Sequence, residues 1–357
     1  MWCACCDATG GWTRRNFLRV LGQAALATGV VPMAARAFTI FDEATDVAIG
    51  REVDPEILKQ YGYYEKPELQ NYVAEVGQRV VAVSGTRFQF QFKVVDSPVV
   101  NAFALPGGFV YITRGILALM NDEAQLAGVL GHESTHVNSR HGAKLMTKAL
   151  GSQVATLAGV GAAAVVGHGS AVSAVAAISN HLTNYMLLGY GREYETEADE
   201  VGLRHARHAG YDPRRMVALF RDMRRQEIMT GQTLYHGFEA THPDTPIRIA
   251  KADTVAEMLL PEGGPVVVKT AEYRLQLDGL TYGEAKAQQW LRTYVVQPGD
   301  TLASIAAAEL GDAGRRFEIA SLNDLRDDAV VAPGLPLKLI VHSPHPPKPH
   351  ELQLAPN

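Results

Sequence analysis

Two histidines one helical turn apart constrain this chain more than any other feature. His132 and His136 lie in the run Gly-His-Glu-Ser-Thr-His, and side chains four residues apart on a helix share one face, close enough to hold a single ion. Glu133 follows the first histidine and can reach a water bound to that ion. Zinc with three protein ligands keeps a fourth position for water and lowers the pKa of that water to about 7. The pattern therefore predicts a zinc site with Glu133 as the general base.

The neighbouring residues predict that both histidines lie on one helix. Asn121 is a suitable N-cap, Asp122 and Glu123 put negative charge in the first turn, and Gly142 is placed to end the helix. An apolar stripe follows the same spacing, at Leu126, Val129, Leu130 and Val137. Matches to HExxH alone are common by chance, so a surface helix that merely carries two histidines is the alternative.

A third ligand is expected from a second helix downstream. Glu195 and Asp199 are again four residues apart, so Glu195 can complete a site of two histidines and one glutamate. Asp199 can accept a hydrogen bond from the free nitrogen of a ligating histidine and fix its tautomer. The alternative is an acidic solvated face, to which we assign Glu193, Glu197 and Glu200.

These motifs together resemble the zinc metallopeptidases of the HtpX, BepA, LoiP and CAAX-endoprotease family, which are HExxH gluzincins. The second helix reads Glu195-x-Glu197-Ala-Asp199-x-x-Gly202-Leu203. Three further pieces agree with the family, and the resemblance covers about residues 45–255: the run 101–112 with its Pro-Gly-Gly, the pair Arg140-His141, and Thr241-His242-Pro243 with Arg248.

The resemblance implies an α+β fold, a mainly helical zincin-type domain with a small antiparallel sheet. It places His242 facing the zinc, where the imidazole either ligates the metal in a closed state or stabilises the oxyanion in an open one. Arg248 either does the same electrostatic work or pairs with an acidic residue. The strand after the Pro-Gly-Gly turn is expected beside the zinc helix, and an exposed edge there pairs with an extended substrate. The residues concerned are Gly108, Phe109, Val110 and Tyr111; an edge without substrate is the alternative.

The N-terminal residues 1–37 have the form of an export signal. Arg14-Arg15 precede a weakly apolar stretch, and Ala35-Arg36-Ala37 has the form of a signal-peptidase site, which together resemble a twin-arginine signal. Because the apolar stretch is shorter than the roughly 20 residues of a spanning helix, we expect cleavage after Ala37, and an N-terminal membrane anchor is the alternative. All three cysteines lie before the twin arginine, at Cys3, Cys5 and Cys6.

Composition excludes some partners. The chain has 357 residues, a net charge of −5 and 20% charged residues, so no basic excess points to nucleic acid or anionic lipid. Residues 149–180 carry almost no charge, yet alanine and glycine gain little from lipid. We therefore expect a helical pair near the cleft, although membrane contact is an open alternative.

Local patterns order the rest of the metallopeptidase domain, which we place at residues 38–260. Amphipathic spacing predicts helices over 42–60 and 67–83, and residues 88–95 alternate as a strand. The segments 101–105 and 109–112 flank a turn and predict a hairpin.

A second domain is predicted after a connector at residues 261–291. Residues 292–341 read as a βααβ unit, with a Pro-Gly turn and a capped helix, and resemble a LysM module. The resemblance implies binding of N-acetylglucosamine-containing glycans by two loops, at Gly299, Asp300, Thr301, Leu302, Pro333 and Gly334. A stabilising domain without glycan affinity is the alternative, and residues 342–357 are expected to be a disordered tail.

The whole sequence predicts a periplasmic, peptidoglycan-anchored zinc endopeptidase with one Zn²⁺ per subunit. Its expected substrates are misfolded or unassembled envelope proteins, by analogy with the family. Two rival functions stay open: a hydrolase of peptidoglycan cross-link peptides, and a peptidoglycan-binding chaperone whose zinc site is closed by His242.

Overall fold

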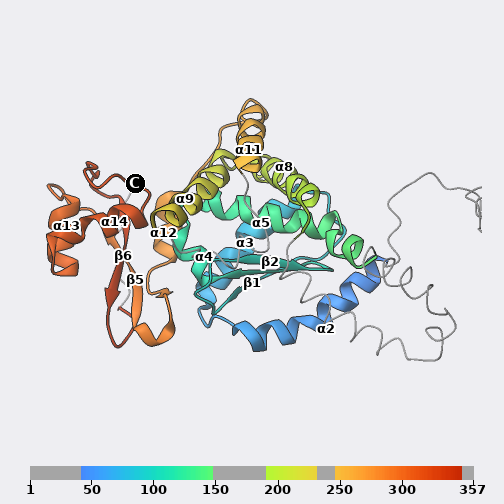
Figure 1. The fold of residues 1–357 in the computed structure, drawn as a ribbon, viewed down its shortest axis with the longest axis horizontal. Coiled ribbons are helices and arrows are strands. Elements are labelled where there is room, and N and C mark those ends of the chain that lie inside the picture. The colour runs from blue at the N-terminus through green and yellow to red at the C-terminus, as the bar shows by residue number, and fades with distance from the viewer. Residues whose placement is uncertain (1–41, 148–189, 231–245, 348–357) are drawn as a thin grey trace, which may run out of the picture. The chain divides into compact units, whose positions relative to one another are not determined.

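The computed structural model describes residues 42–147, 190–230 and 246–347 (Figure 1). It begins with two helices, α2 (Glu43–Tyr61) and α3 (Pro67–Ala82), close to the predicted ranges. Asp42 caps α2 by accepting a 2.8 Å hydrogen bond from the backbone of Thr45, and Pro67 starts α3, where its missing N–H is not needed. The predicted export signal and residues 149–180 lie outside the described residues.

A three-stranded sheet follows, made of β1 (Gln91–Val95), β2 (Ala102–Leu105) and β3 (Phe109–Thr113). The predicted hairpin is confirmed, because β2 and β3 pair antiparallel across the Pro-Gly-Gly turn. β1 pairs parallel with β3, so the sheet is mixed and not purely antiparallel. The strand order β1-β3-β2 makes β3 the central strand. The expectation that the strand after the turn offers a free edge was therefore wrong.

The two faces of this sheet bury different side chains, as the alternation of a strand requires. Figure 1 shows α2 on one side of the sheet and α5 on the other. The face toward α2 is largely aromatic, and the face toward α3 and α5 carries smaller side chains. The first set contains Phe103, Leu105, Phe109 and Tyr111, and the second contains Ala102, Ala104, Val110 and Ile112.

Five further helices of this part are α4 (Arg114–Leu119), α5 (Glu123–Asn138), α8 (Arg192–His208), α9 (Arg214–Thr230) and α11 (Pro246–Leu259), and residues 141–147 are also helical. The helix α5, which carries His132 and His136, differs from the prediction at both ends. Its N-cap is Asp122, which accepts a 2.9 Å hydrogen bond from the backbone of Gln125, and not Asn121. It ends at Asn138, before Gly142, because Arg140 adopts a positive φ of 52° and turns the chain.

The C-terminal part contains the predicted βααβ order. β5 (Gln289–Val295) and β6 (Pro336–His342) are antiparallel, with α13 (Leu302–Leu310) and α14 (Arg316–Leu322) between them. The connector region is more ordered than expected, since it forms α12 (Thr270–Gln276) and β4 (Thr281–Tyr282). β4 pairs with β5 and extends the same sheet. The α+β class is confirmed.

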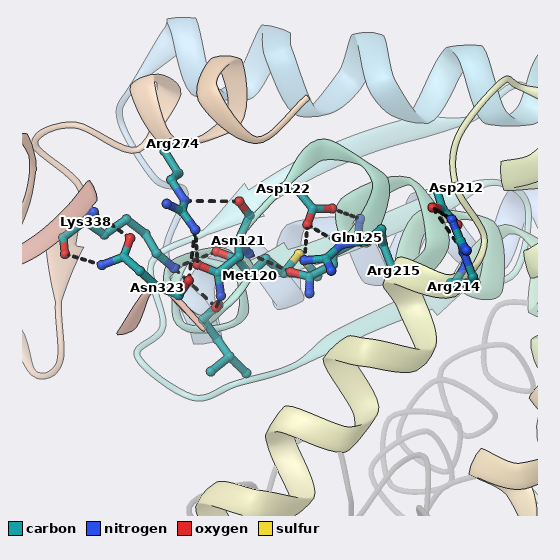
Figure 2. A network of polar contacts seen from close by, with 11 residues as sticks. Met120, Asn121, Asp122, Gln125, Asp212, Arg214, Arg215, Arg274, Asn323 and Lys338 are labelled. Carbon is teal, nitrogen blue, oxygen red and sulfur yellow. Dashed lines mark hydrogen bonds and ion pairs between the residues drawn. The ribbon is translucent and has the colours of Figure 1, made fainter. Parts of the chain in front are cut away.

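Buried polar groups join β6 to the start of α5 (Figure 2). The ammonium group of Lys338 is fully buried and donates to the carbonyls of Ala118 and Met120 at 2.8 and 2.7 Å, where α4 ends. Arg274 donates to Asn121 and to the carbonyls of Pro336 and Asn323. Burial lowers the pKa of Arg274 to about 10. The loop that precedes α5 is thus held by residues of the connector and the βααβ unit.

Within the described ranges, every helix is too short or too polar to cross a bilayer.

Candidate metal centre

Two glycines bring the helices α5 and α8 into backbone contact. A β-carbon at Gly131 would lie 2.7 Å from the carbonyl oxygen of Gly202, and one at Gly202 would lie 2.6 Å from the backbone nitrogen of His132. Both distances are far below ordinary van der Waals contact, so neither position accommodates a side chain. This close crossing places Glu195 of α8 opposite the histidines of α5.

The three predicted ligands converge as expected. His132, His136 and Glu195 are all buried, and one ligand atom from each lies within 4.8 Å of the others. The two histidine Nε2 atoms are 3.1 Å apart, and the Glu195 carboxylate oxygens lie 3.5 and 3.6 Å from them. Ligand atoms about 2.0–2.1 Å from a tetrahedral zinc ion are about 3.3 Å apart. The donor set and its spacing therefore fit zinc.

Asp199 and Arg248 hold this arrangement. Asp199 Oδ1 lies 3.0 Å from His132 Nδ1, which leaves Nε2 of that ring to face the ligand cluster. Arg248 donates to both oxygens of Asp199, at 2.6 and 2.9 Å, and its third nitrogen lies 3.0 Å from Glu195. The guanidinium thus bridges two carboxylates of α8. Of the two roles considered for Arg248, the structure shows the pairing with acidic residues.

The electrostatics of the cluster favour a positive charge. Burial is the largest influence on the pKa of His132 and lowers it, but Asp199 and Glu195 together outweigh burial and raise that pKa to about 10. Burial also tends to raise the pKa of Asp199, yet its bonds to His132 and Arg248 lower it below the ordinary value. Since a ligating histidine must be neutral, a metal ion held here would displace a proton from a charged His132.

Glu133 lies beside the ligands on α5 and is fully buried. It follows His132 directly, which agrees with the predicted role of base.

His242, the other predicted catalytic residue, lies outside the described residues. Tyr190 stacks on His136 with ring centroids 3.9 Å apart and an interplanar angle of 16°.

Comparison with protein-family models gives two matches. The model of peptidase family M48 matches residues 67–256, which is more than half of the chain. The chain belongs to peptidase family M48. A second model, that of the LysM domain, matches residues 294–312. Both matches confirm the resemblances seen in the sequence.

Curated relatives of this M48 chain come from mitochondria and bacteria. It is 34% identical over 203 residues to the mitochondrial metalloendopeptidase OMA1 of Schizosaccharomyces pombe, which covers 56% of this chain and 57% of the relative. It is 28% identical over 213 residues to the beta-barrel assembly-enhancing protease of Escherichia coli K12, which covers 58% of this chain and 42% of the relative. OMA1 of Danio rerio is 30% identical over 207 residues, which cover 52% of this chain and 42% of the relative. The chain thus spans about half the length of these relatives.

The predicted substrate residues of this M48 chain lie elsewhere than expected. Gly108, Phe109, Val110 and Tyr111 are buried, and the last three belong to the central strand β3, which pairs on both sides. Their backbone groups are therefore engaged in the sheet. In the described part of the chain β2 pairs only with β3, so the edge nearer α5 belongs to Ala102–Leu105.

The predicted glycan loops of the LysM domain lie close together. The backbone of Gly334 donates to the carbonyl of Val296, and Gly299 and Gly334 adopt positive φ angles of 90° and 85°. Asp300 accepts hydrogen bonds from Gln297 and Tyr294, and Thr301 caps α13. Leu302 is only 2% exposed because its side chain packs in the LysM core, so only its backbone is left for the predicted contact with glycan. Pro333 lies in the second loop, beside Gly334.

The sequence motifs include Glu197 and His141, but the contacts of these two residues beside the metal ligands were not predicted. Glu197, which was assigned to a solvated face, accepts a 2.5 Å hydrogen bond from Ser139 and faces His141. His141 is fully buried and contacts His136. Helical spacing gave no signal for Glu197, because a residue two positions from both Glu195 and Asp199 lies on a different face of α8.

Proposed function

We propose that the chain is an exported zinc endopeptidase that is anchored to peptidoglycan by its LysM domain. The observation that carries the proposal is the spacing of His132, His136 and Glu195, which matches the distances between ligands of a tetrahedral ion. Two imidazole nitrogens and one carboxylate favour zinc over the oxygen-preferring Mg²⁺ and Ca²⁺. Family membership and the LysM match support the same assignment.

The proposed chemistry is peptide-bond hydrolysis with Glu133 as the proton carrier. A zinc ion at this site would lower the pKa of the attacking water and polarise the scissile carbonyl. Glu133 accepts the proton of that water as it attacks, and returns the proton to the leaving amine nitrogen. Asp199 and Arg248 keep the ligands in place during these steps, since they hold His132 and Glu195.

The edge of β2 is the best candidate for holding an extended substrate. β2 packs against α5, which carries both histidines, and within the described residues its outer side has no partner strand. A peptide added to this edge would be held by main-chain hydrogen bonds, which suits chains of varied sequence. This replaces the role first assigned to residues 108–111.

The proposed substrates are misfolded or unassembled envelope proteins. One relative is named a beta-barrel assembly-enhancing protease, and a LysM domain gives a physical reason for a cell-wall location. The export signal predicted at residues 1–37 is consistent with this location. The domain boundaries at residues 38–260, 261–291 and 292–341 are part of the same proposal.

Metal analysis of three purified proteins tests the site. We expect one zinc ion in the wild type and in Glu133→Gln, and little zinc in Glu195→Ala. Casein should be cleaved by the wild type alone, because Glu133→Gln keeps the metal and loses the base. Full zinc occupancy in Glu195→Ala would remove that residue from the site.

Purified sacculi and unfolded protein separate the possible substrates. We expect the wild type to bind sacculi without releasing cross-link peptides, and to cleave an unfolded protein. Release of such peptides would favour a peptidoglycan hydrolase. Protection against aggregation that is equal in the wild type and Glu133→Gln, without any cleavage, would favour a chaperone.

A further inference from the structure

We propose that His141 is a positioning residue for the metal ligand His136, and that Ser139 and Glu197 hold His141 in place. The proposal rests on the zinc site described above. In this proposal His141 does for His136 what Asp199 does for His132. The two supporting groups differ, because Asp199 is a carboxylate and His141 is an imidazole.

The geometry of the two rings carries the assignment. His136 Nδ1 lies 2.9 Å from His141 Nδ1, while His136 Nε2 faces the ligand cluster. A neutral imidazole carries one N–H, so a His136 that ligates through Nε2 has its proton on Nδ1. That proton is donated to His141 Nδ1, which must then be an acceptor. The contact therefore fixes the tautomer and rotation of His136, as a carboxylate or carbonyl does at other metal sites.

The backbone places His141 for this role. Arg140 adopts a positive φ of 52°, which ends α5 and sends His141 back beside His136, and residues 141–147 are again helical. This conformation is unfavourable for a non-glycine residue and persists only where the surroundings hold it. Arg140 donates a 2.5 Å hydrogen bond to Asp46 of α2, and this contact helps to hold its backbone in the unusual conformation.

The side of His141 away from His136 faces α8. Its Nε2 lies 3.3 Å from Glu197 Oε2, and the other oxygen of Glu197 accepts a 2.5 Å hydrogen bond from Ser139. The ring of Tyr194 stacks on His141, with centroids 4.4 Å apart and an interplanar angle of 22°. The Nε2 atom of His141, which carries the proton in the required tautomer, therefore lies near an anchored carboxylate, although the two are not aligned as a hydrogen bond.

Residues of α8 thus serve the whole cluster from two sides, because Glu195 and Asp199 share one face and Glu197 does not. Glu195 supplies a ligand, Asp199 orients His132, and Glu197 orients His141, which orients His136. The two histidines differ in their support, because His132 contacts a carboxylate directly and His136 contacts a neutral ring. We expect the His136 bond to the metal to be the more sensitive of the two to loss of its support.

The zinc affinity of three His141 and His205 variants tests the proposal. In His141→Leu the acceptor is lost while the volume is nearly kept, so we expect the zinc dissociation constant to rise about 10- to 100-fold. In His141→Asn the amide oxygen occupies the place of Nδ1 and can accept from His136, so we expect an affinity close to that of the wild type. His205→Leu is the matched control, since it replaces a partly buried histidine about 15 Å further along α8 than Glu195.

The absorption spectrum of the Co²⁺-substituted protein gives a second readout. We expect altered d–d bands in His141→Leu and near wild-type bands in His141→Asn and His205→Leu, with thermal unfolding of the metal-free proteins showing that all are folded. Wild-type affinity and spectrum in a folded His141→Leu would overturn the positioning role, and so would an Asn variant as weak as the Leu variant. If the wild type itself binds no zinc, the proposed site fails and not merely this inference.

Discussion

A β-carbon at Gly202 would lie 2.6 Å from the backbone nitrogen of His132. The metal ligands of α5 and α8 can therefore converge only because a glycine stands at this crossing. The reciprocal contact, between Gly131 and the carbonyl of Gly202, imposes the same condition on α5. The Gly202 of the sequence motif is thus a packing requirement of the site.

Gly202→Ala should therefore separate the two helices. Relief of the clash requires a shift of about 1 Å. A misplacement of that size can lower the rate of an enzyme about 100-fold, and the ligands of a metal ion are also held to a fixed geometry. We expect at least a tenfold weaker zinc affinity, measured by competition with a chelator. Gly191→Ala is the matched control, because that glycine precedes α8 and its β-carbon would meet nothing within 4 Å. Unchanged zinc affinity in Gly202→Ala would contradict the argument.

Arg248→Met should destabilise the metal-free protein more than the zinc-loaded one. The guanidinium neutralises Asp199 and Glu195, both buried, and removal of one partner of a buried ion pair typically costs about 3–5 kcal/mol. A zinc ion also neutralises these carboxylates, so it replaces part of what is lost. The measurement is the melting temperature in chelator and in zinc. The gap between the two temperatures should widen in the variant; an unchanged or narrower gap would be evidence against this role.

Much of the site was predictable because spacing on a helix is a local property. His132 and His136 share a face at i and i+4, and so do Glu195 and Asp199, whatever the rest of the chain does. The pairing of the two helices followed from the family resemblance, whereas its physical cause, the glycine crossing, appears only when both backbones are seen. The convergence of the three side chains could therefore be expected from the sequence, although the reason for it could not.

The errors came from features that depend on tertiary contacts. Asn121 and Asp122 are both good N-caps, and only the packing of Asp122 against Gln125 and Arg215 selects between them. A hairpin pattern does not reveal that β1 adds to β3 from a distance in sequence, so the central strand was taken for an edge. The positive φ of Arg140 has no sequence signal, because it is held by Asp46 from another helix.

Glu123 should make stability depend on pH at the acid end. Burial tends to raise the pKa of its carboxyl, but hydrogen bonds from Tyr211, Lys269 and Tyr72 outweigh burial and lower that pKa below the ordinary 4.5. The stabilisation is then complete above about pH 4.5 and is lost as the pH falls through the lower, folded-state pKa. Glu123→Gln imitates the protonated form, so its cost of about 2–3 kcal/mol near neutral pH should shrink below pH 4.5.

Urea unfolding of the wild type and Glu123→Gln from pH 3.5 to 7 measures this difference. The control is Glu56→Gln, since the side chain of Glu56 is 73% exposed and forms only a surface pair with Lys59. The free energy of unfolding of this control should equal that of the wild type at every pH. If the difference in free energy of unfolding between the wild type and Glu123→Gln stays constant from pH 3.5 to 7, the ionised carboxylate of Glu123 is not the source of the stabilisation.

Lys338→Met tests whether the LysM domain is a structural part of the peptidase. The ammonium group lies buried at the end of α4, beside the loop that starts the zinc helix, and its loss leaves the carbonyls of Ala118 and Met120 without their donor (Figure 2). We expect a destabilisation of about 1–3 kcal/mol, which calorimetry should register as a lower midpoint of one shared transition. Lys286→Met, which changes an exposed lysine of the connector, should leave the midpoint unchanged. Two transitions in the wild type, with only one of them shifted by Lys338→Met, would instead show that the LysM domain unfolds by itself and that its buried lysine does not support the start of α5.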